Sequence, residues 1–398
     1  MRLALIGTGR MGTPIAARLR AAGHRLVLYD GAPEARERLA RDGFEVAPDP
    51  AAAARGAEMV LLCLPDAAAV TAVVRHLPEV PLLVDLTSSL PSVTRGLGRR
   101  MVDAPVSGGV SGATAGSLTA MVGGEPDLVA AARPVLAAFA SQVLHAGGLG
   151  AGHAAKALNN ALSAVALSAT SEAVAAARGA AHRPEGTIKR INAGLGRTQN
   201  SEVKFPRDIL PASYASGFTA GLMLKDVGIA LAIAAEREQA APLVAAVREE
   251  WRLVVQALGA GADFTRVYEV VAGWASGPLV SARCDLDHFD RAVAAACWLG
   301  AREMVAVAEA EGVERDRFLE IVNAGSGRSE ATRHFAEGLG FAPRQAARSL
   351  DAVRVVAAAV RQAVPVLAIA AELWKQYSGG WPGGRALPGP PKGGVPPR

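Results

Sequence analysis

The N-terminal segment contains the pattern that most restricts the fold of this chain. An apolar strand is expected over Arg2 to Ile6, and it leads into the loop Gly7-Thr8-Gly9-Arg10-Met11-Gly12. A helical run from Pro14 to Ala22 follows, and a second strand, Arg25 to Tyr29, ends on Asp30. A strand, a glycine loop, a helix, a strand and an acid in this order are the full context of a dinucleotide-binding site. The sequence therefore predicts an α/β Rossmann domain.

The loop glycines have separate tasks in such a site. Gly7 permits the tight turn, Gly9 lets the backbone approach a pyrophosphate, and Gly12 brings helix and strand together. The N-terminus of the helix then faces the phosphates. We expect the whole loop, including Arg10 and Met11, to bind the cofactor.

Asp30 indicates which dinucleotide is bound. It follows Gly12 by 18 residues, and its carboxylate would accept hydrogen bonds from the adenosine ribose. Because a carboxylate repels a 2′-phosphate, we expect NAD rather than NADP. Arg36 and Arg38 lie close enough in sequence to keep NADP open.

Strands and helices continue to alternate as far as the strand Met101 to Ala104. This alternation predicts a parallel, doubly wound sheet that holds ligands at the carboxyl ends of its strands. The strands Met59 to Leu64 and Pro81 to Leu86 end beside residues that we expect to contact the cofactor, although each could be ordinary turn chemistry. These residues are Leu64, Pro65 and Thr87.

The segment after Ala104 reads Pro105-Val106-Ser107-Gly108-Gly109. Glycines and a serine after a strand offer free backbone N–H groups and a hydroxyl, and such a nest can hold a carboxylate. We expect Ser107, Gly108 and Gly109 to bind the substrate, with a merely flexible loop as the alternative. No histidine or acid is placed by sequence to activate Ser107 as a nucleophile.

A long helix is predicted from Gly150 to about Arg178, because this run is rich in strong helix formers and has no proline before Pro184. Lys156 and Asn160 are four residues apart and therefore share a face. The pKa of a lysine within an apolar segment can be lowered, so that its amine can release and accept a proton. A snorkelling lysine on a half-exposed helix is the alternative.

Composition excludes several classes of protein. The net charge of +5 is spread along the chain and only 5% of residues are aromatic, so no nucleic-acid surface is indicated. The three cysteines have no metal-like spacing and favour a reducing compartment. We expect no leader ahead of the first strand, and we expect no membrane span because no uncharged apolar run reaches ~18 residues. We expect a cytoplasmic protein that has no metal and binds a small anionic ligand.

Together these motifs resemble the β-hydroxyacid dehydrogenase family over roughly residues 1 to 270. The resemblance rests on the Gly7 to Gly12 loop, the Asp103 to Gly109 segment, the Gly150 to Asn160 helix and Leu224-Lys225-Asp226-Val227. It implies NAD(P)-dependent oxidoreduction of a small 3-hydroxy acid, such as 3-hydroxyisobutyrate, and its semialdehyde.

The resemblance also implies roles for individual residues. Lys156 would be the catalytic acid/base, Asn160 would position the substrate, and Ser107, Gly108 and Gly109 would bind its carboxylate. Lys225 would close the site beside the cofactor, and Phe218 would line the pocket.

Departures from the family pattern bear on the alternatives. The stretch from Asp85 to Asp103 is short, so we expect a truncated helix after Pro91. Asn159 stands where 6-phosphogluconate dehydrogenases usually have histidine, which argues against that reaction. Lys156 argues against the imine reductases of the same build. An imine or ketone reductase and a non-catalytic cofactor-binding protein remain the alternatives.

A repeat extends the chain beyond the usual family end. The string Ile191-Asn192-Ala193-Gly194-Leu195-Gly196-Arg197 recurs 131 residues later as Val322-Asn323-Ala324-Gly325-Ser326-Gly327-Arg328. At this offset Glu172 corresponds to Glu303, and Lys156 and Asn160 correspond to Asp287 and Arg291. We infer that the all-α domain is duplicated and that its second copy has lost the catalytic pair. Generic Ala-rich helix composition is the alternative.

The predicted domains follow from this repeat. They are a Rossmann NAD(P)-binding domain at 1–149, a first all-α copy at 150–275, a second copy at 276–378 and a disordered Gly/Pro-rich tail at 379–398. The resemblance implies that helical domains associate between subunits, and a second copy could supply that surface internally. We therefore expect a homodimer or a monomer.

Overall fold

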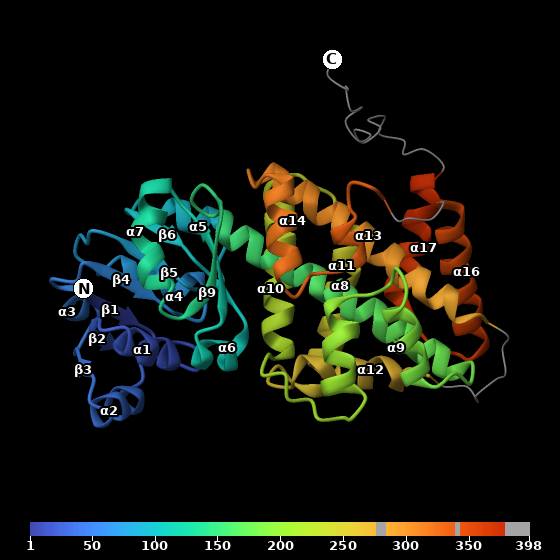
Figure 1. The fold of residues 1–398 in the computed structure, drawn as a ribbon, viewed down its shortest axis with the longest axis horizontal. Coiled ribbons are helices and arrows are strands. Elements are labelled where there is room, and N and C mark those ends of the chain that lie inside the picture. Colours follow the sequence, from blue (N-terminus) through green and yellow to red (C-terminus); the bar gives the residue numbers. More distant parts are fainter. Residues whose placement is uncertain (276–283, 339–342, 379–398) are drawn as a thin grey trace, which may run out of the picture. The chain divides into compact units, whose positions relative to one another are not determined.

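A computed structural model describes residues 1–275, 284–338 and 343–378, so the predicted tail lies outside the described residues. The chain forms two compact units (Figure 1). The first contains Met1–Asn159, Asp226–Gln239 and Val305–Gly325, and the second contains the described residues of Asn160–Lys225, of Ala240–Met304 and of the part that begins at Ser326. The domain boundaries derived from the sequence stay a prediction.

The first unit is built on one sheet of nine strands, in the order β3-β2-β1-β4-β5-β6-β8-β7 with β9 paired to β8. Strands β1 to β6 pair in parallel, whereas β8 pairs antiparallel with both β6 and β7. The Rossmann architecture is therefore confirmed. The strands are β1 (Arg2–Ile6), β2 (Arg25–Tyr29), β3 (Glu45–Val46), β4 (Met59–Leu62), β5 (Leu83–Asp85), β6 (Met101–Asp103), β7 (Val106–Ser107), β8 (Leu118–Gly123) and β9 (Ala140–Gly147).

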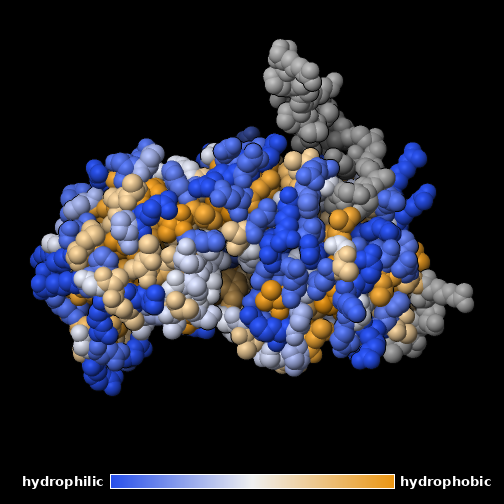
Figure 2. All heavy atoms as spheres, viewed as in Figure 1, coloured by the Kyte–Doolittle hydropathy of each residue, from blue (hydrophilic) through white to orange (hydrophobic). Residues whose placement is uncertain are grey.

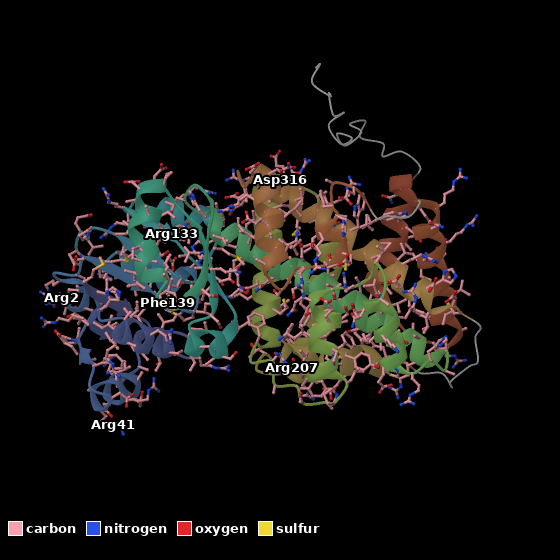
Figure 3. All side chains as sticks on the ribbon, in the orientation of Figure 1. Arg2, Arg41, Arg133, Phe139, Arg207 and Asp316 are labelled. Atoms are coloured by element: carbon pink, nitrogen blue, oxygen red, sulfur yellow. The ribbon has the colours of Figure 1, made fainter. Side chains whose placement is uncertain are left out.

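Side chains of β1 alternate between two apolar clusters, because successive residues of a strand point to opposite faces of a sheet. Leu3 and Leu5 pack into one cluster with residues of the helices α1 (Gly12–Ala21) and α7 (Pro126–Leu136). Ala4 and Ile6 pack into the other with residues of α3 (Pro50–Ala54) and α4 (Ala67–Val74). Phe139, just after α7, is fully buried in the first cluster (Figure 3). Both faces of the sheet are thus covered by helices.

The helices of this region begin near the predicted positions. The first starts at Gly12 rather than Pro14, so the last loop glycine belongs to the helix. The helix after Leu90 has only six residues, which confirms the predicted truncation. The helices are α1 (Gly12–Ala21), α2 (Pro33–Arg41), α3 (Pro50–Ala54), α4 (Ala67–Val74), α5 (Pro91–Gly96), α6 (Gly109–Ala115) and α7 (Pro126–Leu136).

The rest of the described chain is helical. Helix α8 (Ala151–Gly179) is buried without interruption from residue 151 to residue 177, and Asn159 and Asn160 within it are the last residue of one unit and the first of the next. The other elements are α9 (Pro184–Asn192), the π-helical η1 (Asn200–Ile209), α10 (Ala220–Glu236), α11 (Pro242–Leu258), η2 (Phe264–Arg266), α12 (Val267–Gly273), α13 (Leu286–Ala310), α14 (Arg315–Ala324), α15 (Glu330–Arg333), α16 (Pro343–Ala359) and α17 (Pro365–Ser378).

Contacts in the second unit come in reciprocal pairs. The carboxylate of Glu172 accepts hydrogen bonds from the backbone N–H groups of Val366 (2.8 Å) and Leu367 (2.8 Å) at the start of α17. Glu303 accepts the corresponding bonds from Leu243 (2.9 Å) and Val244 (3.0 Å) at the start of α11. Each helix N-terminus is thus capped by a glutamate from the other predicted copy.

The repeated strings themselves pair with each other. Thr198 and Ser329 form an antiparallel bridge. On either side of it, Gln199 N donates to Arg328 O (2.9 Å) and Glu330 N donates to Arg197 O (3.0 Å). The duplication stays a prediction, and these reciprocal contacts favour it.

No described helix combines the length and the apolar character that crossing a bilayer requires. On the face shown in Figure 2, apolar residues are interspersed with hydrophilic ones.

Candidate active site

A cavity of about 790 Å³ lies in the first unit at the carboxyl ends of β1, β2 and β4. It brings together eight of the ten residues expected to bind the cofactor. These are Gly7, Gly9, Arg10, Met11, Gly12, Asp30, Leu64 and Pro65. Thr87 is not part of the lining, and Lys225 belongs to the second unit.

Close backbone packing explains two of the loop glycines. Gly7 has a φ of +95°, and a Cβ atom on it would lie 2.2 Å from the carbonyl oxygen of Cys63. A Cβ atom on Gly12 would lie 2.0 Å from the carbonyl oxygen of Gly7. Gly9 has open space around its Cα, with nothing within 4 Å of an added Cβ. The loop therefore fits a dinucleotide, because an extended ligand can approach the backbone at Gly9.

The carboxylate of Asp30 is fixed at the rim of this cavity. Its Oδ2 accepts hydrogen bonds from Thr8 N (2.7 Å) and Thr8 Oγ1 (2.9 Å), and its Oδ1 accepts one from Ala32 N (2.9 Å). Burial opposes ionisation, but these hydrogen bonds and the positive charge of Arg38 outweigh it, so the pKa of Asp30 is lowered. Asp30 is therefore a fixed negative charge at the predicted ribose position.

Arg36 lies beside the same rim. Its Nη1 donates to the carbonyl oxygens of Asp30 (2.7 Å) and Gly31 (3.1 Å), and its guanidinium lies 5.7 Å from the centroid of the Tyr29 ring. A guanidinium held here could contact a 2′-phosphate. The position of Arg36 therefore supports keeping NADP open as a cofactor.

Cys63 and His76 line the cavity, although the sequence analysis did not select them. Burial, together with the charges of Asp85 and Asp30, raises the pKa of the Cys63 thiol to about 12, so this group is not a nucleophile at neutral pH. Thr87 acts indirectly, since its Oγ1 accepts a hydrogen bond from Leu64 N (3.1 Å) and so shapes the end of β4. The position of Thr87 at a strand end could not show whether its side chain contacts the cofactor or binds the backbone of Leu64.

The N-terminus of α8 is anchored to the sheet by Asp103. One carboxylate oxygen accepts a hydrogen bond from Gly150 N (2.7 Å) and the other accepts one from His153 N (2.7 Å). The approach is close, because a Cβ atom on Gly152 would lie 2.3 Å from the carbonyl oxygen of Met121. The acid that begins the predicted substrate segment thus caps the helix that carries Lys156.

Lys156 lies in the second turn of α8 and is only 6% exposed. This burial differs from the snorkelling lysine that was the alternative. One turn earlier, His153 Nε2 lies 3.4 Å from Asp85 Oδ2, with both side chains fully buried. The amine is therefore placed on a helix whose first turn is fixed to the sheet by Asp103.

The predicted substrate loop is a tight turn that requires glycine. Ser107 ends β7, and Gly108 and Gly109 follow with φ values of +125° and +66°. A Cβ atom on Gly108 would lie 3.0 Å from Leu118 Cδ2. Two consecutive residues with positive φ turn the backbone sharply at the start of α6. Successive backbone N–H groups in a turn can form a nest for an anion such as a carboxylate.

The remaining predicted residues belong to the second unit. Asn160 is 4% exposed, and its Oδ1 accepts a hydrogen bond from Ser326 Oγ (3.5 Å). Phe218 packs edge-to-face on Phe264, with ring centroids 5.6 Å apart, and Lys225 is half-buried on α10. Their roles toward a substrate stay predictions. The sequence pattern indicated Ser326 only as a member of the repeated string and did not indicate its contact with Asn160.

Two family models match consecutive parts of the chain. Residues 2–148 match the NAD binding domain of 6-phosphogluconate dehydrogenase, and residues 150–271 match the NAD-binding domain of NADP-dependent 3-hydroxyisobutyrate dehydrogenase.

Curated relatives agree with these models. The chain is 34% identical over 293 residues to a 3-hydroxyisobutyrate dehydrogenase of Pseudomonas aeruginosa, covering 68% of this chain and 98% of the relative. It is 33% identical over 289 residues to an NAD-dependent L-serine dehydrogenase of the same organism, covering 68% and 97%. Among solved structures, Mycobacterium tuberculosis 3-hydroxyisobutyrate dehydrogenase with L-serine matches with a TM-score of 0.63 and 32% identity, covering 68% of this chain and 98% of that one.

Proposed function

This chain belongs to the β-hydroxyacid dehydrogenase family of NAD(P)-dependent oxidoreductases, and from that premise we propose that it interconverts a small 3-hydroxy acid and its semialdehyde. The observation that carries the proposal is the placement of Lys156. This buried amine lies on a helix anchored by Asp103 to the same sheet whose strand ends form the dinucleotide cavity.

The proposed mechanism assigns the proton to Lys156. The bound nicotinamide supplies a hydride acceptor for oxidation and a hydride donor for reduction. In oxidation the neutral amine of Lys156 removes the proton from the substrate hydroxyl, and in reduction the ammonium returns a proton to the carbonyl oxygen. Asn160, four residues further along α8, shares the helix face of Lys156 and donates a hydrogen bond to the substrate.

The carboxylate of the substrate is assigned to Ser107, Gly108 and Gly109. Two residues with positive φ form the turn after β7, and backbone N–H groups in such a turn bind anions. The small residues of this segment leave room for a short acid, and Val110 beside them favours a substrate with a methyl branch. We therefore propose a substrate of the 3-hydroxyisobutyrate type, and similarity to an L-serine dehydrogenase makes serine the first competitor to test.

A panel assay tests this proposal. Reduction of NAD and of NADP is followed spectrophotometrically with 3-hydroxyisobutyrate, serine and other 3-hydroxy acids. Lys156→Ala should lower kcat by at least ~100-fold while cofactor still binds, because general acid/base catalysis is lost. Lys189→Ala, at an exposed lysine on α9, is the control and should retain full turnover. Equal turnover in Lys156→Ala and the wild type would rule out the assigned role.

A further inference from the structure

The turn that contains Ser326 contacts α8 beside the lysine's helical turn. Ser326 Oγ donates to Oδ1 of the buried Asn160 side chain across 3.5 Å. The preceding residue must be small, because a Cβ atom on Gly325 would lie 2.6 Å from Asn159 Oδ1. The second predicted copy thus brings a hydroxyl to the residue that is expected to position the substrate.

We propose that Ser326 is a positioning residue for the substrate and acts through Asn160. A side-chain amide has an acceptor end and a donor end. Because the hydroxyl of Ser326 donates to the acceptor end, it fixes which end of the Asn160 amide is turned toward Ser326, and the N–H donors lie at the opposite end. This inference rests on the proposed function and adds to it a residue from the part of the chain beyond the family matches, which end at residue 271.

The other copy of the turn shows what the same backbone does without this hydroxyl. Leu195 corresponds to Ser326, and residues 191–200 and 322–331 have the same sequence of buried, half-buried and exposed positions. There Gly194 approaches Asp290, since an added Cβ atom would lie 2.2 Å from Asp290 Oδ2, and Gly196 N donates to Asp290 Oδ1 (2.7 Å). The two turns therefore pack alike and differ in the side chain that they present.

In the other copy, the side chains at the positions of the lysine and the amide form ion pairs. Asp287 and Arg291 stand at the positions of Lys156 and Asn160. Arg190 Nε lies 2.6 Å from Asp287 Oδ1, and Arg291 Nη2 lies 3.1 Å from Asp287 Oδ2. An ion-pair cluster thus replaces the lysine and the amide. Of these two turns, the one at Leu195 has neither the hydroxyl of Ser326 nor an amide at the position of Asn160, so Leu195 provides a matched control.

The test compares three variants of the full chain. In Ser326→Ala, KM for the hydroxy acid should rise about fivefold, the usual effect of losing one hydrogen bond. The value of kcat should change less, because the amide is oriented before the chemical step. The Kd for NAD should stay unchanged, since neither Ser326 nor Asn160 lines the cofactor cavity. Ser326→Thr retains the hydroxyl and should restore KM, and Leu195→Ala should leave KM unchanged.

The outcomes separate this inference from the proposed function. An unchanged KM in Ser326→Ala, or an equal rise in Leu195→Ala, would overturn the positioning role while wild-type turnover still supports the dehydrogenase. Failure of the wild type to oxidise any 3-hydroxy acid would overturn the proposed function, and the inference with it.

Discussion

At the scale of single residues, the charge of Asp30 is expected to set the preference between NAD and NADP. Hydrogen bonds lower the pKa of this carboxyl, so it is ionised at neutral pH and repels a 2′-phosphate. Asp30→Asn removes the charge and keeps the side-chain shape. The ratio of kcat/KM with NAD to that with NADP should fall about tenfold, the effect of one nearby charge. Steady-state kinetics with both cofactors measure this ratio.

Glu34→Gln provides the control for this substitution. Glu34 lies in the first turn of α2, close to Asp30 in sequence, but it is exposed and does not line the cavity. A cofactor preference that shifts equally in both variants would mean that net charge, and not the position of Asp30, decides the preference.

The loop glycines were predictable because their role depends on backbone conformation and close backbone packing, not on a side chain. Gly7 and Gly12 are required by close approaches that no other residue permits, so their spacing identifies them once the flanking strands, the helix and Asp30 are also present. Thr87 and Cys63 show where this reasoning stops. Both lie at strand ends, but side-chain direction decides that Cys63 lines the cavity and that Thr87 binds the backbone of Leu64 instead. A sequence pattern specifies the strand end and not that direction.

At the scale of elements, Asp103 is expected to hold the N-terminus of α8 in place. Its two oxygens accept separate backbone hydrogen bonds, from Gly150 and His153. In Asp103→Asn one oxygen becomes an N–H donor that faces another donor in a buried position. The free energy of unfolding should fall by about 2 to 3 kcal/mol, as for the loss of a charged hydrogen bond, and thermal denaturation should show a lower midpoint.

Asp127→Asn is the matched control. The side chain of Asp127 is 72% exposed and lies 3.7 Å from Arg100. An exposed ion pair of this kind contributes little, so the midpoint should stay close to that of the wild type. If both variants melt at the wild-type temperature, Asp103 does not anchor the helix.

Elements with a regular pattern were predictable, and those shaped by packing were not. The residues of β1 are a short apolar run that leads directly into the glycine loop, and α8 is a long run of helix formers, so both were expected close to their observed bounds. The π-helical η1, by contrast, contains Pro206, and its sequence has no periodic pattern that predicts a π-helix. Its geometry depends on neighbours that are distant in sequence.

At the scale of the whole molecule, the reciprocal contacts bear on the oligomeric state. Glu172 caps α17 and Glu303 caps α11, so the two predicted copies satisfy each other within one chain. A chain that pairs its two helical copies internally does not require a second subunit to cover their contact surface. Light scattering after size-exclusion chromatography should therefore give the mass of one chain, 40.8 kDa, or of two. A tetramer would contradict internal pairing of the copies.

The same capping glutamates make the stability of the molecule depend on pH. Burial raises the pKa of Glu303 to about 7, against the lowering effect of the hydrogen bonds from Leu243 and Val244. Burial and the nearby Glu250 raise the pKa of Glu172 as well. The folded state therefore binds more protons than the unfolded state. The resulting contribution to the free energy of unfolding is complete below the ordinary pKa of glutamate and is lost as pH rises towards 7. For Glu303 the loss is about 3 kcal/mol.

Urea denaturation at pH 5 and pH 8 measures this effect. The wild type should have a lower unfolding midpoint at pH 8, and the difference between the two pH values should shrink in Glu303→Gln, since glutamine does not titrate. The comparison uses differences, because Glu303→Gln also weakens the cap of α11 at every pH. Glu309→Gln removes an exposed carboxylate from the same helix and should keep the wild-type difference. An undiminished pH difference in Glu303→Gln would show that Glu303 is already ionised at pH 5, and that its carboxylate caps α11 throughout this range.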